Sequence, residues 1–189
     1  MKHPHEKSSY LYIMAVVIGI ILVGGTVYVS RSGGGGNNET QAGKPNTAVV
    51  GTEQSEQRLA PNFTLNQLGG GTIELASYRG QKPVVLDFFA TWCPNCRRDM
   101  PHLNNLYEKY KDQVEVIGID LQEQASLVEP FVTDLGITFP IALDTQGKVS
   151  QLYGVRYTNF HVLIDKAGNV VGSVPGDIKE SDITNLIGE

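Results

Sequence analysis

Residues 84–96 read VVLDFFATWCPNC and join a short apolar run to two closely spaced cysteines. The run 84–89 is bounded by a Lys-Pro pair before it and a threonine after it, a pattern typical of a buried strand. Downstream of the cysteines, apolar residues recur at helical spacing, at Met100, Leu103, Leu106, Tyr107 and Tyr110. The pattern therefore predicts a helix over 94–111 whose first turn carries the cysteine pair.

Strands and helices alternate along the rest of the chain. The expected elements are strands at 114–119, 141–143, 161–165 and 169–174, and helices at 126–135 and 181–187. A Lys-Ala-Gly turn between the last two strands predicts a hairpin, and Ser181 is expected to cap the last helix. Alternating elements that end in a hairpin and a helix predict an α/β fold with a mixed sheet over 59–189.

The N-terminal part has a different composition. Residues 11–29 (LYIMAVVIGIILVGGTVYV) carry no charged side chain, and a helix of this length spans roughly 28 Å, about the apolar thickness of a bilayer. We expect a single-pass signal-anchor in the cell membrane, with residues 1–10 in the cytoplasm and the folded domain on the extracytoplasmic side. A cleaved signal peptide is the alternative, although the apolar stretch exceeds an ordinary signal core. Residues 30–58, rich in Gly, Asn, Thr and Gln, are expected to be a flexible linker.

Charge and cysteine content exclude several classes of protein. The 189 residues include 15 Lys and Arg against 20 Asp and Glu, a net charge of -5. A nucleic-acid binder needs a basic face to neutralise phosphates, so nucleic acid is not expected as a partner. Cys93 and Cys96 are the only cysteines, which excludes a disulfide-rich scaffold and a four-cysteine zinc site.

Several segments of the chain resemble the thioredoxin superfamily and, more narrowly, the membrane-anchored TlpA/ResA-type thiol-disulfide oxidoreductases. They are Ala60-Pro-Asn-Phe63, 84–96, Met100-Pro101, 136–144, 153–156 and 162–168. The resemblance implies a thioredoxin fold, a mixed central sheet flanked by helices, with an N-terminal strand or hairpin extension and no cofactor. It also implies client proteins with disulfides, apocytochrome c among them, and a membrane thiol-disulfide transporter as the electron donor.

The cysteine pair has chemistry that follows from its position. Cys93 is expected at the helix N-terminus, where unpaired backbone N–H groups and the helix dipole favour a thiolate. This thiolate can attack a client disulfide, and Cys96, one turn later, can resolve the mixed disulfide. The alternatives are a structural disulfide, or half of a metal site completed by His102 or His161.

Two carboxylates are candidates for the group that takes the proton from Cys96. Asp87 lies on the buried strand six residues before Cys93, and a buried carboxylate has a raised pKa that suits this role. Its spacing is similar to that of the buried acid of thioredoxin. Glu123 follows the next strand, where the resemblance to ResA-type proteins implies an active-site glutamate; the alternative is a solvated loop residue.

Four further residues are expected to contact the client: Trp92, Pro94, Thr158 and Asn159. For Trp92, which would cover the disulfide, the alternative is ordinary packing at the strand end. Asn159 occupies the position where the superfamily carries a cis-proline, and we expect the Thr158–Asn159 bond to be trans because a non-proline cis bond costs about 2.5–4 kcal/mol. Thr158 would offer backbone hydrogen bonds to an extended client. The Asn159 amide is expected to approach the sulfurs, and a proline at this position is expected to raise exchange activity.

Two other functions compete with disulfide reduction. A peroxiredoxin needs a P-x-x-x-T-x-x-C motif, and no proline occurs between Val84 and Cys93, so the motif fails. A client-binding module that has lost exchange activity is the other alternative, because Asn159 departs from the family pattern.

Overall fold

The structure of the chain is a computed structural model, and it describes residues 58–188. The expected cytoplasmic tail (1–10), the expected membrane anchor (11–29) and nearly all of the expected linker (30–58) lie outside these described residues. Within residues 58–188, no helix has both the length and the apolar character needed to cross a membrane.

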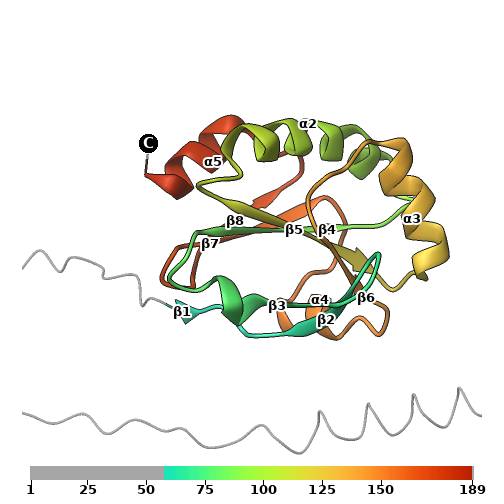
Figure 1. The fold of residues 1–189 in the computed structure, drawn as a ribbon, viewed down its shortest axis with the longest axis horizontal. Helices are drawn as coiled ribbons and strands as arrows, with labels where there is room; N and C mark the ends of the chain where they lie inside the picture. Colours follow the sequence, from blue (N-terminus) through green and yellow to red (C-terminus); the bar gives the residue numbers. More distant parts are fainter. Residues whose placement is uncertain (1–57, 189) are drawn as a thin grey trace, which may run out of the picture. The chain divides into compact units, whose positions relative to one another are not determined.

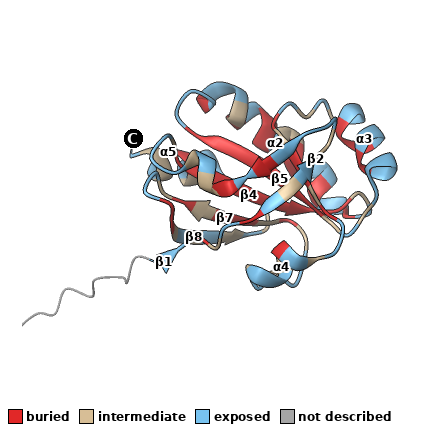
Figure 2. Cartoon of the chain, turned by 60° about the horizontal axis from the view of Figure 1, so that its bottom comes forward, coloured by how far each residue is buried: buried red, intermediate tan, exposed pale blue. Residues whose placement is uncertain are grey.

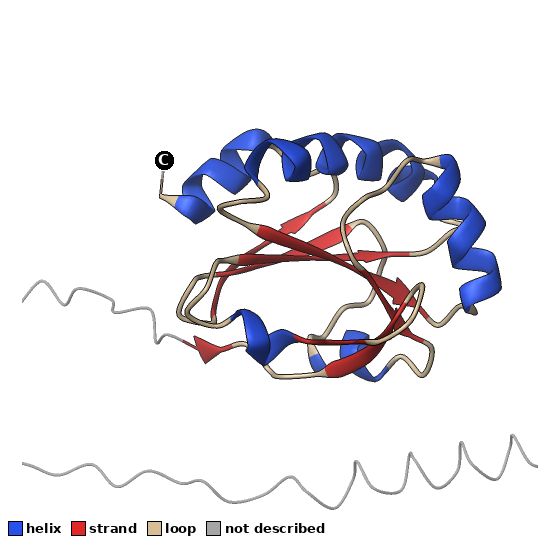
Figure 3. Ribbon diagram, in the orientation of Figure 1, coloured by secondary structure: helices blue, strands red, loops and turns tan. Residues whose placement is uncertain are grey.

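A mixed sheet organises the described region, with the strand order β1-β8-β7-β4-β5-β6-β2-β3 (Figures 1 and 3). Its strands are β1 (Arg58–Leu59), β2 (Thr64–Gln67), β3 (Thr72–Glu74), β4 (Val84–Phe89), β5 (Glu115–Leu121), β6 (Ile141–Asp144), β7 (Phe160–Ile164) and β8 (Asn169–Pro175). The helices are α2 (Pro94–Tyr110), α3 (Ala125–Asp134), α4 (Lys148–Leu152) and α5 (Glu180–Ile187), with a short 3-10 helix η1 (Leu75–Tyr78). Strands β4, β5 and β6 are parallel, and the remaining pairings are antiparallel.

Strand β4 is the centre of the domain. It pairs with β5 on one edge and β7 on the other, and all six of its residues are buried (Figure 2). Val85 and Phe89 pack in one core cluster, whereas Leu86 and Phe88 pack in the other. Since alternate residues of a strand point to opposite faces, β4 supplies apolar side chains to both layers that cover the sheet.

The two faces of the sheet are covered by different elements. Helices α2, α3 and α5 contribute Met100, Phe131 and Ile183 to the cluster on one face. Residues of the β2–β3 region, η1 and α4 contribute to the cluster on the other face. In Figure 1, α4, β2 and β3 lie on the side of the sheet opposite α2 and α5. The helix that carries the cysteine pair therefore lies on the α5 side of β4.

The predicted elements and the hairpin extension are confirmed, with ends that differ by one or two residues. The prediction that Ser181 caps the last helix is wrong. Helix α5 begins one residue earlier, and its cap is Lys179, whose backbone N–H donates to Asp182 Oδ2 at 2.8 Å. An acidic side chain three positions after the N-cap accepts the hydrogen bond from the N-cap backbone N–H. The start of α5 is therefore stabilised without a serine hydroxyl at the N-cap.

Candidate active site

Cys93 and Cys96 lie where β4 passes into α2. Cys93 is the N-cap of α2, and its Sγ accepts a hydrogen bond from the backbone N–H of Cys96 at 3.1 Å. The two cysteines form a disulfide whose Cα atoms are 5.3 Å apart. An acceptor at this position gains from the unpaired N–H groups and from the helix dipole, most of all when it is an anion. Cys93 is therefore the sulfur whose thiolate the fold stabilises.

The surroundings of the pair distinguish the two sulfurs. Cys93 keeps 4% of its surface exposed, whereas Cys96 is fully buried. Pro94 occupies the first turn of α2, where its fixed φ suits the helix and its missing N–H costs no hydrogen bond. An incoming disulfide can reach Cys93 alone.

Asp87 lies on β4, the strand that leads into the cysteine pair. Its neighbours two residues away, Val85 and Phe89, share the core cluster of Cys93 and Cys96, so its side chain points to the same face of the sheet. Only 1% of Asp87 is exposed, and this burial raises its pKa to about 7. A carboxyl group with this pKa can both accept and return a proton near neutral pH.

Two further buried residues join Asp87. The β4–β7 register places His161 directly opposite Asp87, and His161 Nε2 lies 3.3 Å from Asp87 Oδ1. The same nitrogen lies 3.4 Å from Oδ2 of Asp99, which is on α2. Burial raises the pKa of Asp99 to about 6 although His161 opposes the rise, and burial lowers the pKa of His161. We call Asp87, Asp99 and His161 the buried triad.

Neither Asp99 nor the role of His161 beside Asp87 is predicted from the sequence, in which His161 is a candidate only as a metal ligand. The position of Asp99 in the sequence gives one indication of a role. Asp99 lies about one helical turn after Cys96 and one turn before Leu103, on the apolar side of the helix. A charged residue next to an apolar stripe of this kind is a candidate for function. His161 sits in the apolar strand FHVLI, but only the strand register shows that it faces Asp87.

Glu123 fixes the backbone next to the cysteines. Its two carboxylate oxygens accept hydrogen bonds from the Thr91 backbone N–H and the Thr91 hydroxyl, each at 2.6 Å. The Glu123 backbone N–H in turn donates to Asp120 Oδ2 at 3.1 Å. Asp120 is fully buried, and this burial raises its pKa to about 7. Glu123 is therefore a partly buried anchor for the residues before Cys93, and not a solvated loop residue.

The Thr158–Asn159 segment lies at the entrance to β7. Residues 58–188 contain no cis peptide bond, which confirms the expected trans bond, and Asn159 has a left-handed φ of 57°. The Asn159 N–H donates to the Phe88 carbonyl at 2.9 Å, and its carbonyl accepts from Gly176. Its side-chain Nδ2 donates to Asp177 Oδ1 at 3.0 Å, so the amide nitrogen is directed at Asp177, and the approach of the amide group to the sulfurs stays a prediction.

This geometry predicts that proline at position 159 destabilises the fold, which argues against the expected gain in exchange activity. Proline has no N–H for the Phe88 carbonyl, and its φ is fixed near -65°, far from the 57° of Asn159. Thr158 differs from Asn159, because its backbone N–H and carbonyl have no hydrogen-bond partner within the described region. Thr158 thus keeps a backbone edge that an extended peptide can use.

Trp92 borders an open hollow beside the cysteine pair. Its side chain is 69% exposed, so it is not buried by ordinary packing at the strand end. The hollow has a volume of about 230 Å³ and is lined by Trp92, Leu121, Gln122, Ser150, Val155, Arg156, Tyr157 and Thr158. Exposed aromatic side chains next to unpaired backbone groups suit the binding of a peptide segment.

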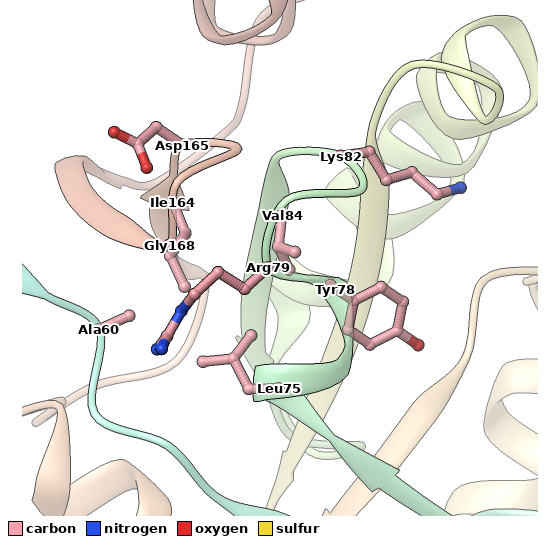
Figure 4. A pocket seen from close by; sticks show the side chains of 9 residues that line it. All are labelled: Ala60, Leu75, Tyr78, Arg79, Lys82, Val84, Ile164, Asp165 and Gly168. Carbon is pink, nitrogen blue, oxygen red and sulfur yellow. The ribbon is translucent and has the colours of Figure 1, made fainter.

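Two other places can be set aside as sites. The cavity in Figure 4 lies at the start of β4, beside Val84, whereas the cysteines follow the other end of this strand. Its volume of about 10 Å³ is no larger than one water molecule needs. His102 is exposed on α2, and within residues 58–188 no three His, Cys, Asp or Glu side chains are arranged to hold a metal ion.

Comparison with known proteins agrees with this geometry. Residues 57–173 match the AhpC/TSA family. The thiol-disulfide oxidoreductase ResA of Bacillus thuringiensis subsp. konkukian is 41% identical over 119 residues, which are 62% of this chain and 68% of the relative. ResA of Bacillus subtilis is 37% identical over 147 residues, 75% of this chain and 82% of the relative.

A solved structure supports the same assignment. The thiol:disulfide interchange protein of the thioredoxin family from Chlorobium tepidum superimposes with a TM-score of 0.64 at 25% identity, over 71% of this chain and 96% of the other. The fold is therefore thioredoxin-like, as the sequence predicted. The chain belongs to the AhpC/TSA family and is a thioredoxin-like thiol-disulfide oxidoreductase related to ResA.

Proposed function

We propose that this oxidoreductase reduces disulfides in client proteins, with Cys93 as the nucleophile and Cys96 as the resolving cysteine. One observation carries the proposal: Cys93 is the N-cap of α2 and its sulfur accepts the Cys96 N–H. This arrangement favours the thiolate on Cys93 over that on Cys96, because only Cys93 lies at the positive end of the helix dipole.

The reaction consists of two exchanges that balance in electrons and protons. The Cys93 thiolate attacks one client sulfur, a Cys93–client disulfide forms, and the other client sulfur leaves as a thiolate. Asp87 then takes the Cys96 proton, and the Cys96 thiolate attacks Cys93 Sγ. The Cys93–Cys96 disulfide forms, the second client sulfur leaves, and the client has gained two electrons.

The hollow next to Trp92 is the proposed client site. An extended client segment would pair with the unpartnered backbone of Thr158 and place a side chain against the exposed rings of Trp92 and Tyr157. This position brings the client disulfide to Cys93, which directly follows Trp92 in the chain. A short peptide with an oxidised Cys-x-x-Cys-His sequence, the haem-attachment motif of c-type cytochromes, is the probe for the proposed apocytochrome c role.

The proposed location is the extracytoplasmic face of the cell membrane. Residues 11–29 carry no charged side chain over a length that matches the apolar thickness of a bilayer, which supports a membrane anchor. The composition of the linker, residues 30–58, supports a flexible tether that lets the folded domain lie away from the bilayer. A membrane thiol-disulfide transporter is the proposed electron donor. Because the chain has only two cysteines, a membrane-impermeant thiol reagent applied to intact cells after mild reduction tests this topology directly: labelling is expected, and protection until the cells are lysed contradicts it.

Insulin reduction with dithiothreitol as the electron source tests the proposed activity. The full chain is expected to accelerate insulin precipitation, and Cys93→Ala is expected to abolish the acceleration. His102→Gln, an exposed residue of the same helix, is the control and should keep full activity. A wild-type chain that binds insulin but does not reduce its disulfides supports the binding module instead, and turnover of hydrogen peroxide in place of insulin supports a peroxidase.

A further inference from the structure

The buried triad contains more polar atoms than its hydrogen bonds satisfy. In the described region, two atoms of the triad, His161 Nε2 and Asp87 Oδ2, are buried without a hydrogen-bond partner, as is Oδ1 of Asn159, which is not part of the triad. His161 Nε2 is nevertheless within 3.4 Å of two carboxylates that come from different elements, β4 and α2. Buried polar atoms without partners are costly, so their retention next to a redox pair indicates a group that exchanges protons.

The other ring nitrogen defines which tautomer His161 adopts. Nδ1 lies 3.3 Å from the backbone carbonyl of Val174, on β8. A carbonyl can only accept a hydrogen bond, so this contact favours the tautomer with the hydrogen on Nδ1. In the neutral ring, Nε2 is then a lone pair that faces Asp87 and Asp99. A lone pair and a carboxylate repel unless a proton lies between them, and therefore the triad is built to hold at least one shared proton.

We propose that His161 is a positioning residue that shares this proton with Asp87, beside the Asp99 carboxylate, during disulfide exchange. The inference rests on the proposed reaction, in which Asp87 takes the proton of Cys96. As Cys96 becomes a thiolate and then forms the disulfide, its proton moves to Asp87 and is shared with His161 Nε2. When the disulfide is next reduced by two electrons, the same proton returns through Asp87 to the Cys96 sulfur.

The charges around His161 favour this role. Asp87 faces it from β4 and Asp99 from α2, and Asp177 and Asp182 act on it from the loop before α5 and from α5 itself. Arg98 and Asn159 both bond to Asp177, at 2.7 Å and 3.0 Å. Asp177 therefore has its own partners, and the two triad carboxylates remain the groups in contact with Nε2.

The first test uses the unmodified ring and requires no folded variant of His161. Nitrogen NMR shifts of the four histidine rings are recorded against pH in the full chain, first oxidised and then reduced with dithiothreitol, and the single variants His3→Gln, His5→Gln and His102→Gln assign the other three rings. We expect the pH dependence of the His161 shifts to differ between the two redox states, whereas the signals of the exposed His102 should not depend on the redox state. An identical His161 titration in both states overturns the proposal.

The second test measures resolution itself. A mixed disulfide between Cys93 and thionitrobenzoate is formed, and release of the coloured thiolate reports the attack of Cys96 from pH 5 to pH 9. General-base catalysis is worth about 10²–10⁴-fold, and we expect His161→Gln to lose about tenfold at neutral pH and to lose one ionisation from the pH profile. His102→Gln should match the wild-type profile. An unchanged profile in His161→Gln contradicts the proposal.

The two tests separate this inference from the proposed function. If the full chain fails to reduce insulin but His161 still responds to the redox state of the cysteines, client reduction is wrong and the proton link stands. If insulin is reduced and both histidine tests give no difference, the proton link is wrong and the reductase activity stands.

Discussion

Replacing Asp87 with asparagine should stabilise the oxidised protein at alkaline pH while it slows disulfide resolution. Burial raises the Asp87 pKa from 3.8 to about 7. Between these two pH values the folded chain holds a proton that the unfolded chain has lost, so wild-type stability falls as pH rises through this window. At 1.36 kcal/mol per pH unit, the loss approaches roughly 4 kcal/mol above pH 7. Asparagine has a similar shape and no proton to lose, so the variant avoids this loss.

The assay is urea unfolding of the oxidised full chain at pH 4, 5.5, 7 and 8.5. The difference in free energy of unfolding between Asp87→Asn and wild type should grow with pH and level off above pH 7. Asp112→Asn, which removes an exposed carboxylate after α2, is the control and should give a flat difference. The same Asp87→Asn chain should resolve the thionitrobenzoate adduct at least about 100-fold more slowly. A difference that does not change with pH would refute the reasoning, because any constant offset reflects packing alone.

Three further predictions follow from the site. Iodoacetamide should alkylate Cys93 before Cys96 in the reduced chain near neutral pH, as peptide mass spectrometry can measure, and preferential labelling of Cys96 would reverse their roles. Glu123→Gln should lower the free energy of unfolding by about 1–2 kcal/mol, because it weakens two charge-assisted hydrogen bonds to Thr91. The rate at which Cys96 resolves the mixed disulfide should keep its wild-type pH profile in this variant. Loss of an ionisation from that profile would make Glu123 the group that takes the Cys96 proton. Asn159→Pro should cost at least about 1 kcal/mol in urea unfolding, since it removes the bond to the Phe88 carbonyl, and a more stable or more active variant would contradict this reading of the turn.

The sequence predicts the secondary structure well because the spacing of apolar residues agrees with the turn and boundary residues at the ends of each strand and helix. The run 84–89 has no polar residue except Asp87, so both its type and its burial follow from composition. The short helix α4 was not anticipated, since five residues are too few for a helical period to stand out. The cap at Lys179 was also missed, because its partner is the Asp182 side chain and not a serine hydroxyl.

The residues of the site that the sequence predicts are likewise those with a local signal. Cys93, Cys96 and Asp87 were found because each lies in one continuous stretch of chain. The partners of Asp87 were not, because they depend on the register of β4 against β7 and on the packing of α2 over the sheet. The backbone at Asn159 could not be predicted either, since its left-handed φ is held by contacts with Phe88 and Gly176, far away in the sequence.

The central claim is that Cys93 attacks client disulfides and Cys96 resolves them, and trapping the intermediate tests it most directly. Cys96→Ser, reduced and then mixed with an oxidised Cys-x-x-Cys-His peptide, is digested and analysed by mass spectrometry without reductant. The account predicts a stable disulfide between Cys93 and one peptide cysteine, and no comparable adduct from Cys93→Ser. An adduct that forms equally well through Cys96 in Cys93→Ser, or no adduct in Cys96→Ser, would contradict it.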